Sequence, residues 1–219
     1  MARIKQFVSL GAATLTVLAL AAPPASAAGT TIRKGSATAD PYEGKVQAVL
    51  LGTASVSTSL GGGTCNRSTM AGTTKSDGTA LDISAASFTN DPGPACGDAA
   101  VTTERLPWTG GSTVFDAAHT GGRDAAVTIA NARVKAIAFG MTCYYGGNLT
   151  ANGFNPDNPG RGDTTVAEAQ VSVKNSVVNK QSGSGFLCPS TATVTANYKL
   201  LGEKTAGSGV FDQTLYVTG

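Results

Sequence analysis

The sequence contains one histidine, one tryptophan and few charged residues, and it has no long apolar run after residue 27. A single histidine cannot supply a site that needs several imidazole ligands, and no two of the four cysteines have the close spacing of a zinc knuckle. No segment after residue 27 has the length and apolar character of a transmembrane helix. We therefore expect no metal, no other cofactor and no membrane span in this part of the chain.

Residues 1–27 have the pattern of a secretory signal peptide. Two basic residues precede an uncharged apolar run that ends at Ala22, and Ala25-Ser26-Ala27 supplies the small residues that a signal peptidase accepts. We predict that residues 1–27 are removed and that the mature protein begins at Ala28. The predicted location is therefore extracellular, and retention at the cell surface remains open.

Removal of the signal peptide balances the charge of the protein. The chain has 16 Lys and Arg against 14 Asp and Glu, and the two basic residues among residues 1–27 account for the difference. The remaining charges are scattered singly, so they form no basic stripe to neutralise phosphates or anionic lipid. This pattern argues against binding to nucleic acid or to a membrane surface, and it leaves an extracellular ligand or protein of unknown identity as the expected partner.

The four cysteines, Cys65, Cys96, Cys143 and Cys188, all lie in the part predicted to be exported. An even number of cysteines in an oxidising compartment predicts two disulfides. Three pairings are possible, and we favour Cys65–Cys96 with Cys143–Cys188 because sequential pairing closes two moderate loops, one in each half of the chain. Each disulfide is expected to stabilise the fold by about 3–4 kcal/mol.

Short segments in which apolar and polar residues alternate predict β-strands along the mature chain. In Thr191–Leu201 one face carries Ala192, Val194, Ala196, Tyr198 and Leu200, and the other face is polar. We also predict one continuous strand over Ala132–Cys143. In this strand Ile137, Phe139 and Met141 share a face with Cys143, so that the half-cystine points into the core.

The strand spacing predicts an all-β fold. Further strands are expected at residues 45–60, 80–89, 99–104, 112–116, 125–130, 165–178 and 210–217, with glycine- and proline-rich turns between them. Seven to ten antiparallel strands favour one β-sandwich over residues 42–219, immunoglobulin-like or with Greek-key connections, and an open barrel is the alternative. Residues 28–41 are predicted to be a flexible N-terminal segment. Residues 152–163 are predicted to be a long surface loop.

Trp108, Tyr144 and Tyr145 are the candidate ligand-binding residues. The chain has few aromatic residues, Pro107-Trp108 lies where the alternating pattern lapses, and Tyr144-Tyr145 directly follows Cys143. An exposed cluster of these rings would stack on a sugar or cover an apolar ligand. The alternative, which we favour because a lone tryptophan is usually well buried, is that Trp108 packs over a disulfide in the core.

Several short motifs accompany the cysteine framework: Leu106-Pro107-Trp108, Cys143-Tyr144-Tyr145-Gly146-Gly147, Ala196-Asn197-Tyr198-Lys199 and Leu215-Tyr216-Val217. Together with the cysteines, they resemble a group of uncharacterised secreted actinobacterial β-rich proteins with four cysteines, over most of the mature chain. The resemblance implies export and a β-rich fold, and it carries over no activity, ligand or catalytic residue.

The sequence contains no arrangement typical of an enzyme active site, so we expect a secreted or cell-surface-associated, non-enzymatic protein with a binding or structural role in the envelope or extracellular matrix. The alternative is a secreted protease inhibitor or other enzyme modulator that presents Phe186-Leu187-Cys188-Pro189 as a disulfide-anchored loop, and exposure of Leu187 is what this alternative requires. A hydrolase is the third hypothesis. It would need His119 to meet Asp116 and a serine in a polar cleft.

Overall fold

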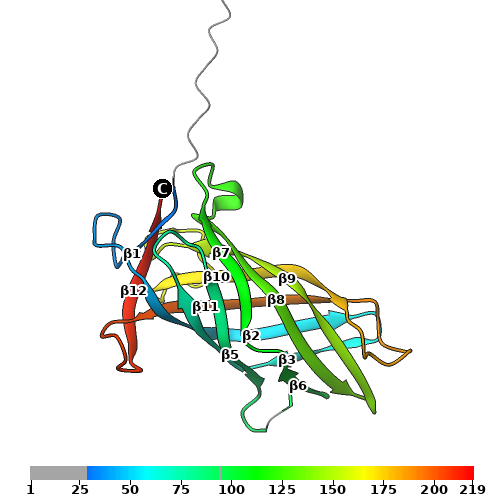
Figure 1. Cartoon of the computed structure of the whole chain (residues 1–219). Helices are drawn as coiled ribbons and strands as arrows, with labels where there is room; N and C mark the ends of the chain where they lie inside the picture. Colours follow the sequence, from blue (N-terminus) through cyan, green and yellow to red (C-terminus); the bar gives the residue numbers. More distant parts are fainter. Residues whose placement is uncertain (1–28, 94) are drawn as a thin grey trace, which may run out of the picture.

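The protein consists mainly of antiparallel β-strands (Figure 1), which confirms the predicted all-β class. The computed structural model describes residues 29–93 and 95–219, and the predicted signal peptide over residues 1–27 lies outside the described residues. One short 3-10 helix covers Thr120–Gly122. The strands are β1 (Thr31–Lys34), β2 (Gly44–Thr58), β3 (Gly61–Cys65), β4 (Arg67–Thr74), β5 (Leu81–Thr89), β6 (Ala99–Thr103), β7 (Trp108–Phe115), β8 (Ala125–Ala138), β9 (Met141–Phe154), β10 (Ala169–Lys180), β11 (Thr191–Glu203) and β12 (Phe211–Thr218).

Eight strands close into an antiparallel barrel in the order β2, β4, β5, β7, β8, β9, β10 and β11. β11 completes the circle by pairing with β2, from Gly202 opposite Val46 to Thr193 opposite Ser57. The prediction of a β-sandwich is therefore corrected to a closed barrel. The physical reason is that β2 is hydrogen-bonded along both edges, so the two sheet edges that a sandwich leaves open are joined here.

Two positions in the barrel wall are filled by broken strands. One edge of β2 pairs with β4 through residues 44–49 and with β3 through residues 54–58. In the same way, β8 pairs with β7 through residues 125–128 and with β6 through residues 134–138. β3 and β4 therefore share one position beside β2, and β6 and β7 share one position beside β8.

The region predicted as one strand over Ala132–Cys143 is instead a hairpin. β8 ends at Ala138, and β9 begins at Met141. Phe139 and Gly140 form the two-residue turn with φ of 51° and 73°, the left-handed backbone that such hairpins require. A turn of two residues preserves the two-residue alternation of apolar and polar positions. The sequence pattern therefore continues from β8 into β9 and does not reveal that the chain reverses direction between them. Cys143 is buried as predicted.

The face predicted for β11 is confirmed. Ala192, Ala196 and Tyr198 are buried in the core, and Val194 and Leu200 pack against it. These residues point into the barrel, and the alternate residues point outward, as expected for a strand with one wet face.

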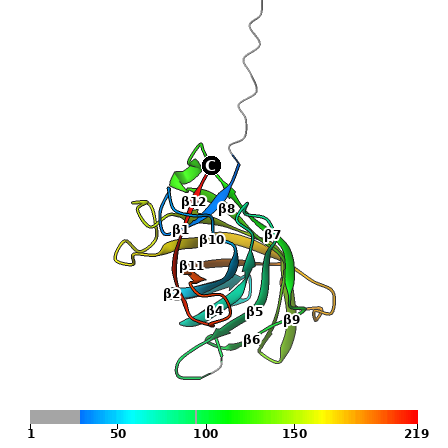
Figure 2. The same ribbon diagram turned by 60° about the vertical axis from the view of Figure 1, so that its left-hand side comes forward.

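One end of the barrel is covered by β1 and β12, which lie remote from the β8–β9 hairpin in both views (Figures 1 and 2). Ile32 pairs with Val217 across these strands, and both side chains are buried. Within the segment predicted to be flexible, residues 31–34 form β1, which is paired with a strand near the C-terminal end of the chain. Asn155 holds β12 in place at this end. Its buried side chain donates a hydrogen bond to the carbonyl of Val217 at 2.9 Å and accepts one from the amide of Val217 at 2.7 Å.

Both predicted disulfides are confirmed. Cys65 is bonded to Cys96 and Cys143 to Cys188. The first disulfide joins β3 to the β5–β6 connection, and the second joins β9 to the β10–β11 connection. Together they fix both connections to the barrel wall. All four half-cystines are buried.

Candidate functional site

The half of the barrel that carries both disulfides encloses a cavity of about 200 Å³. Its wall is almost entirely apolar, and short side chains dominate it: Ala54, Val56, Val101, Ala132, Val134, Ala136, Val173, Val178, Ala192, Val194 and Ala196. Larger side chains fill the interior of an eight-stranded barrel, whereas alanine and valine do not reach across its axis. The choice of small residues on several strands therefore leaves the space open.

Two of the three candidate aromatic residues lie in the cavity wall. Trp108 from β7 and Tyr145 from β9 are buried and border the cavity. Tyr144 points to the other side of β9, where the guanidinium of Arg133 lies 4.8 Å from the centre of its ring. The three residues therefore do not form one exposed cluster: Trp108 is buried in the core, and it also lines the cavity.

The polar atoms of the aromatic residues that border the cavity have partners within the protein. The indole nitrogen of Trp108 donates to the carbonyl of Glu104 at 2.8 Å, and the hydroxyl of Tyr145 donates to the carbonyl of Pro189 at 3.2 Å. The hydroxyls of Tyr198 and Ser68 form a buried hydrogen bond of 3.1 Å. These rings therefore offer a ligand their apolar surface.

The tyrosine side chains in the wall are uncharged near neutral pH. Burial raises the pKa of Tyr198, and the hydrogen bond from Ser68 offsets this only in part. Burial also raises the pKa of Tyr145. The charged form of each phenol is disfavoured in these surroundings, which keeps this part of the wall neutral.

A layer of four side chains limits the cavity at its inner end. Met70, Ile129, Val173 and Tyr198 border both this cavity and a second one of about 90 Å³ toward the end covered by β1 and β12. Leu215 and Val217 of β12 also border the smaller cavity. The larger cavity therefore points away from the covered end, toward the loops that carry the disulfides.

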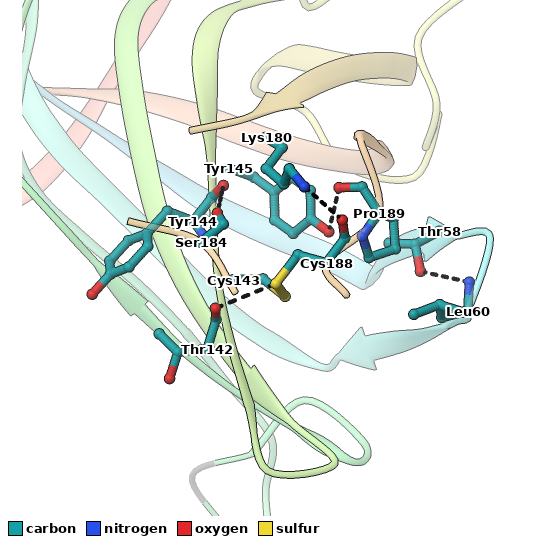
Figure 3. The surroundings of a disulfide bond; sticks show 10 residues. All are labelled: Thr58, Leu60, Thr142, Cys143, Tyr144, Tyr145, Lys180, Ser184, Cys188 and Pro189. Atoms are coloured by element: carbon teal, nitrogen blue, oxygen red, sulfur yellow. Dashed lines mark hydrogen bonds between the residues drawn. A yellow bond between two sulfur atoms is a disulfide. The ribbon is translucent and has the colours of Figure 1, made fainter. Parts of the chain in front are cut away.

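The rim of the larger cavity is formed by the tips of the connections at that end of the barrel. Leu60 of the β2–β3 turn, Phe139 of the β8–β9 turn and Pro189 of the β10–β11 connection all border it. Figure 3 shows Pro189 directly after Cys188 of the Cys143–Cys188 disulfide, and Leu60 on the turn that begins at Thr58. Leu60 and Phe139 are also largely exposed to solvent.

The β10–β11 connection is fastened to the wall at several points. The amide of Gly185 donates to the carbonyl of Thr142 at 2.9 Å, and the Arg133 guanidinium donates to the carbonyl of Ser182 at 2.7 Å. The side chain of Ser184 bonds the backbone of Tyr144, as Figure 3 shows. With the disulfide, these contacts fix the chain on both sides of Phe186 and Leu187, whose side chains are exposed.

His119 and Asp116 do not form the site that a hydrolase would need. Asp116 is held by the side chain of Arg123 at 2.7 Å, whereas His119 Nδ1 lies 3.3 Å from the buried carboxylate of Asp124. Asp124 also accepts from the amide of Asn155 at 2.7 Å. This polar cluster ties the β7–β8 connection to the residues that follow β9, at a distance from the cavity, and we interpret it as structural.

The cavity was not foreseen from the sequence. The signal that could have indicated it is the repeated alanine and valine on the inward faces, such as Ala132, Val134 and Ala136 in β8 or Ala192, Val194 and Ala196 in β11. Small residues on an inward face predict either tight packing or a void. The choice between them depends on how far apart the facing strands lie.

Comparison with protein-family models, with curated proteins and with solved structures gives no match. Within residues 29–93 and 95–219, no helix is long and apolar enough to cross a membrane.

Proposed function

We propose that this protein is a non-enzymatic binding protein, secreted or held at the cell surface, that takes a small apolar molecule into its barrel. The observation that carries the proposal is the cavity of about 200 Å³ with an almost entirely apolar wall. Concave apolar sites with few polar groups are typical of small-molecule binding.

The size and chemistry of the cavity define the ligand class. An apolar cavity of about 150 Å³ accommodates benzene, so this one suits a compact molecule of roughly seven to ten carbon atoms. Since the hydroxyls of Tyr145 and Tyr198 already have partners, a ligand without hydrogen-bonding groups loses nothing by binding there. A longer ligand would extend through the rim between Leu60 and Phe139.

Arg133 and the His119–Asp124 pair are engaged within the protein, which supports binding without catalysis. Arg133 contributes to the wall but sends its guanidinium to the carbonyl of Ser182, over the ring of Tyr144. The His119–Asp124 pair belongs to the structural cluster described above. Neither group is directed at a molecule in the cavity.

The protease-inhibitor alternative has one supporting observation, which is that Phe186 and Leu187 are exposed beside Cys188. The amide of Cys188 donates to the carbonyl of Gly185 at 3.1 Å, which closes these residues into a turn. Recognition by strand addition requires an extended segment instead. We therefore prefer ligand binding, and inhibition of a panel of secreted proteases by the intact protein would decide for the alternative.

Calorimetric titration with toluene and limonene, which have seven and ten carbon atoms, tests the proposal. Trp108 is the only tryptophan and lies in the wall, so its emission gives a second reading of occupancy. We expect dissociation constants in the range of about 1–200 μM. Glucose serves as a polar ligand that should not bind.

Two matched variants sharpen this test. Ala132→Leu adds three carbons inside the cavity, and Ala85→Leu makes the same change at an exposed position of β5. We expect Ala132→Leu to weaken limonene binding at least about tenfold, whereas Ala85→Leu leaves it unchanged. Absence of binding to the wild type, or equal loss in both variants, would overturn the proposal.

A further inference from the structure

Four large apolar side chains stand in solvent at the end of the barrel where the cavity opens. The exposed fractions are 56% for Leu60, 74% for Phe139, 94% for Phe186 and 66% for Leu187. They come from three separate connections of the chain. Exposed apolar side chains that gather in one region commonly mark an interaction site.

The backbone at each of these tips directs the side chain outward. Leu60 follows Thr58, whose hydroxyl donates to the carbonyl of Gly61 at 2.7 Å and accepts from the amide of Leu60 at 3.2 Å. Phe139 has a left-handed backbone with φ of 51°, which is unfavourable for a bulky residue. Such strain concentrates at functional positions, and a turn of this kind would be more stable with asparagine.

Phe186 and Leu187 are held in the same way. They occupy the centre of the turn closed between Gly185 and Cys188, next to the Cys143–Cys188 disulfide. The bond from Gly185 to the carbonyl of Thr142 places this turn beside the start of β9, which directly follows the turn that carries Phe139. The tips therefore lie around the opening of the cavity. The β8–β9 hairpin that carries Phe139 lies at the end of the barrel remote from β1 and β12 in Figure 1.

We propose that these four side chains insert into the surface of a lipid bilayer, so that the opening of the cavity faces the membrane. The occupant is lipid because the exposed side chains continue the apolar lining of the cavity: Leu60 and Phe139 belong to both. A molecule that prefers an apolar cavity to water also dissolves in the acyl chains of a bilayer. Docking would therefore let this ligand move between the bilayer and the cavity without passing through water. This last step rests on the proposed function, whereas docking itself rests on the exposed tips.

The charges near the tips fit a zwitterionic surface. Lys180, whose ammonium group donates to the carbonyl of Cys188 at 3.1 Å, and Lys135 of β8 provide cations, and Asp98 in the cavity wall provides an anion. Neither lysine forms an ion pair within the described part of the chain. The scattered charges argue against electrostatic binding to an anionic membrane, but they do not oppose apolar insertion into a zwitterionic one. Because the charge is balanced over residues 28–219, insertion is expected to depend on apolar contact and to be insensitive to salt.

Co-sedimentation with phosphatidylcholine vesicles tests the proposal. The protein is purified after expression of the full chain, with both disulfides formed. Phe186→Ser/Leu187→Ser removes both apolar side chains of one tip, and Val210→Ser removes an apolar side chain of similar exposure (58%) near the start of β12, away from the opening. We expect the double variant to bind vesicles at least about a hundredfold more weakly and Val210→Ser to bind as the wild type does.

Phe139→Asn separates docking from folding. Asparagine before Gly140 is preferred in this type of turn, so the thermal midpoint should not fall, whereas vesicle binding should drop about tenfold. Limonene binding in the cavity should persist in Phe186→Ser/Leu187→Ser, because neither side chain borders the cavity. Conversely, Ala132→Leu should lose limonene and keep vesicle binding, so that failure of the ligand site and failure of the docking surface give different results.

Three outcomes would overturn the proposal. The first is a wild type that does not bind vesicles, and the second is equal binding by Phe186→Ser/Leu187→Ser and Val210→Ser. The third is binding that disappears at high salt, which would indicate charge and not apolar insertion. If ultracentrifugation instead shows a dimer that the double variant abolishes, without vesicle binding, the tips contact a second copy of the chain.

Discussion

Replacement of Ala132 by leucine should stabilise the protein if the cavity is as open as the geometry indicates. Ala132 lies in β8, faces the barrel interior and borders the cavity. Most large residues introduced into a packed core destabilise it because neighbouring side chains must move. A leucine that enters unoccupied space instead gains burial without displacing its neighbours.

The magnitude follows from the volume. An empty cavity of about 200 Å³ costs at most roughly 5 kcal/mol relative to a filled core, at about 24 cal/mol per Å³. The three added carbons recover up to about 2.4 kcal/mol, and a strained rotamer subtracts about 1 kcal/mol. We expect a net gain of about 1–2 kcal/mol in the free energy of unfolding, which corresponds to a rise of about 2–8 °C in Tm for a chain of this size.

Differential scanning calorimetry of the ligand-free protein measures this change, with Ala85→Leu as the control at an exposed site. The control should differ from the wild type by less than about 0.5 kcal/mol. A Tm of Ala132→Leu at or below that of the wild type would show that the space around Ala132 is already filled. That result would rule out both the open cavity and the proposed ligand site.

Three further predictions concern the scaffold. Replacing Cys143 and Cys188 together by serine should cost about 4 kcal/mol of stability, since the disulfide closes a loop of 45 residues, and calorimetry measures the fall in Tm. Because burial raises the pKa of Tyr198, the proton is held more tightly in the folded state, so stability is complete below about pH 10 and is lost as the pH rises through the raised pKa. Urea unfolding between pH 7 and 11 should show this loss, and Tyr198→Phe should reduce it while costing about 1 kcal/mol at pH 7, where Ser68 loses its partner. Asn155→Ala should cost about 2 kcal/mol, because two buried hydrogen bonds to β12 are lost, and hydrogen exchange should show faster opening of β12 than of β8.

The candidate site shows where sequence reasoning succeeds and where it stops. Scarcity of aromatic residues singled out Trp108 and Tyr145, and both border the cavity. Tyr144 alternates with Tyr145 along β9 and so lies on the opposite face. Phe139 was placed on the inward face of one long strand, because nothing in the alternation marks a two-residue turn that contains phenylalanine where asparagine or glycine is usual.

Alternation within a single segment predicts a strand with one buried face, as in β11, and the four cysteines predict two disulfides, because these signals act over short or moderate separations along the chain. Of the three possible pairings, the structure has the favoured one. Tertiary structure decided the closure of the barrel, since β2 and β11 pair across more than a hundred residues and either a sandwich or a barrel buries the same faces. It also decided the cavity and the apolar rim. The cavity depends on the diameter that eight paired strands impose, and the rim depends on which turns lie together at one end of the barrel. No single segment of the sequence encodes either property.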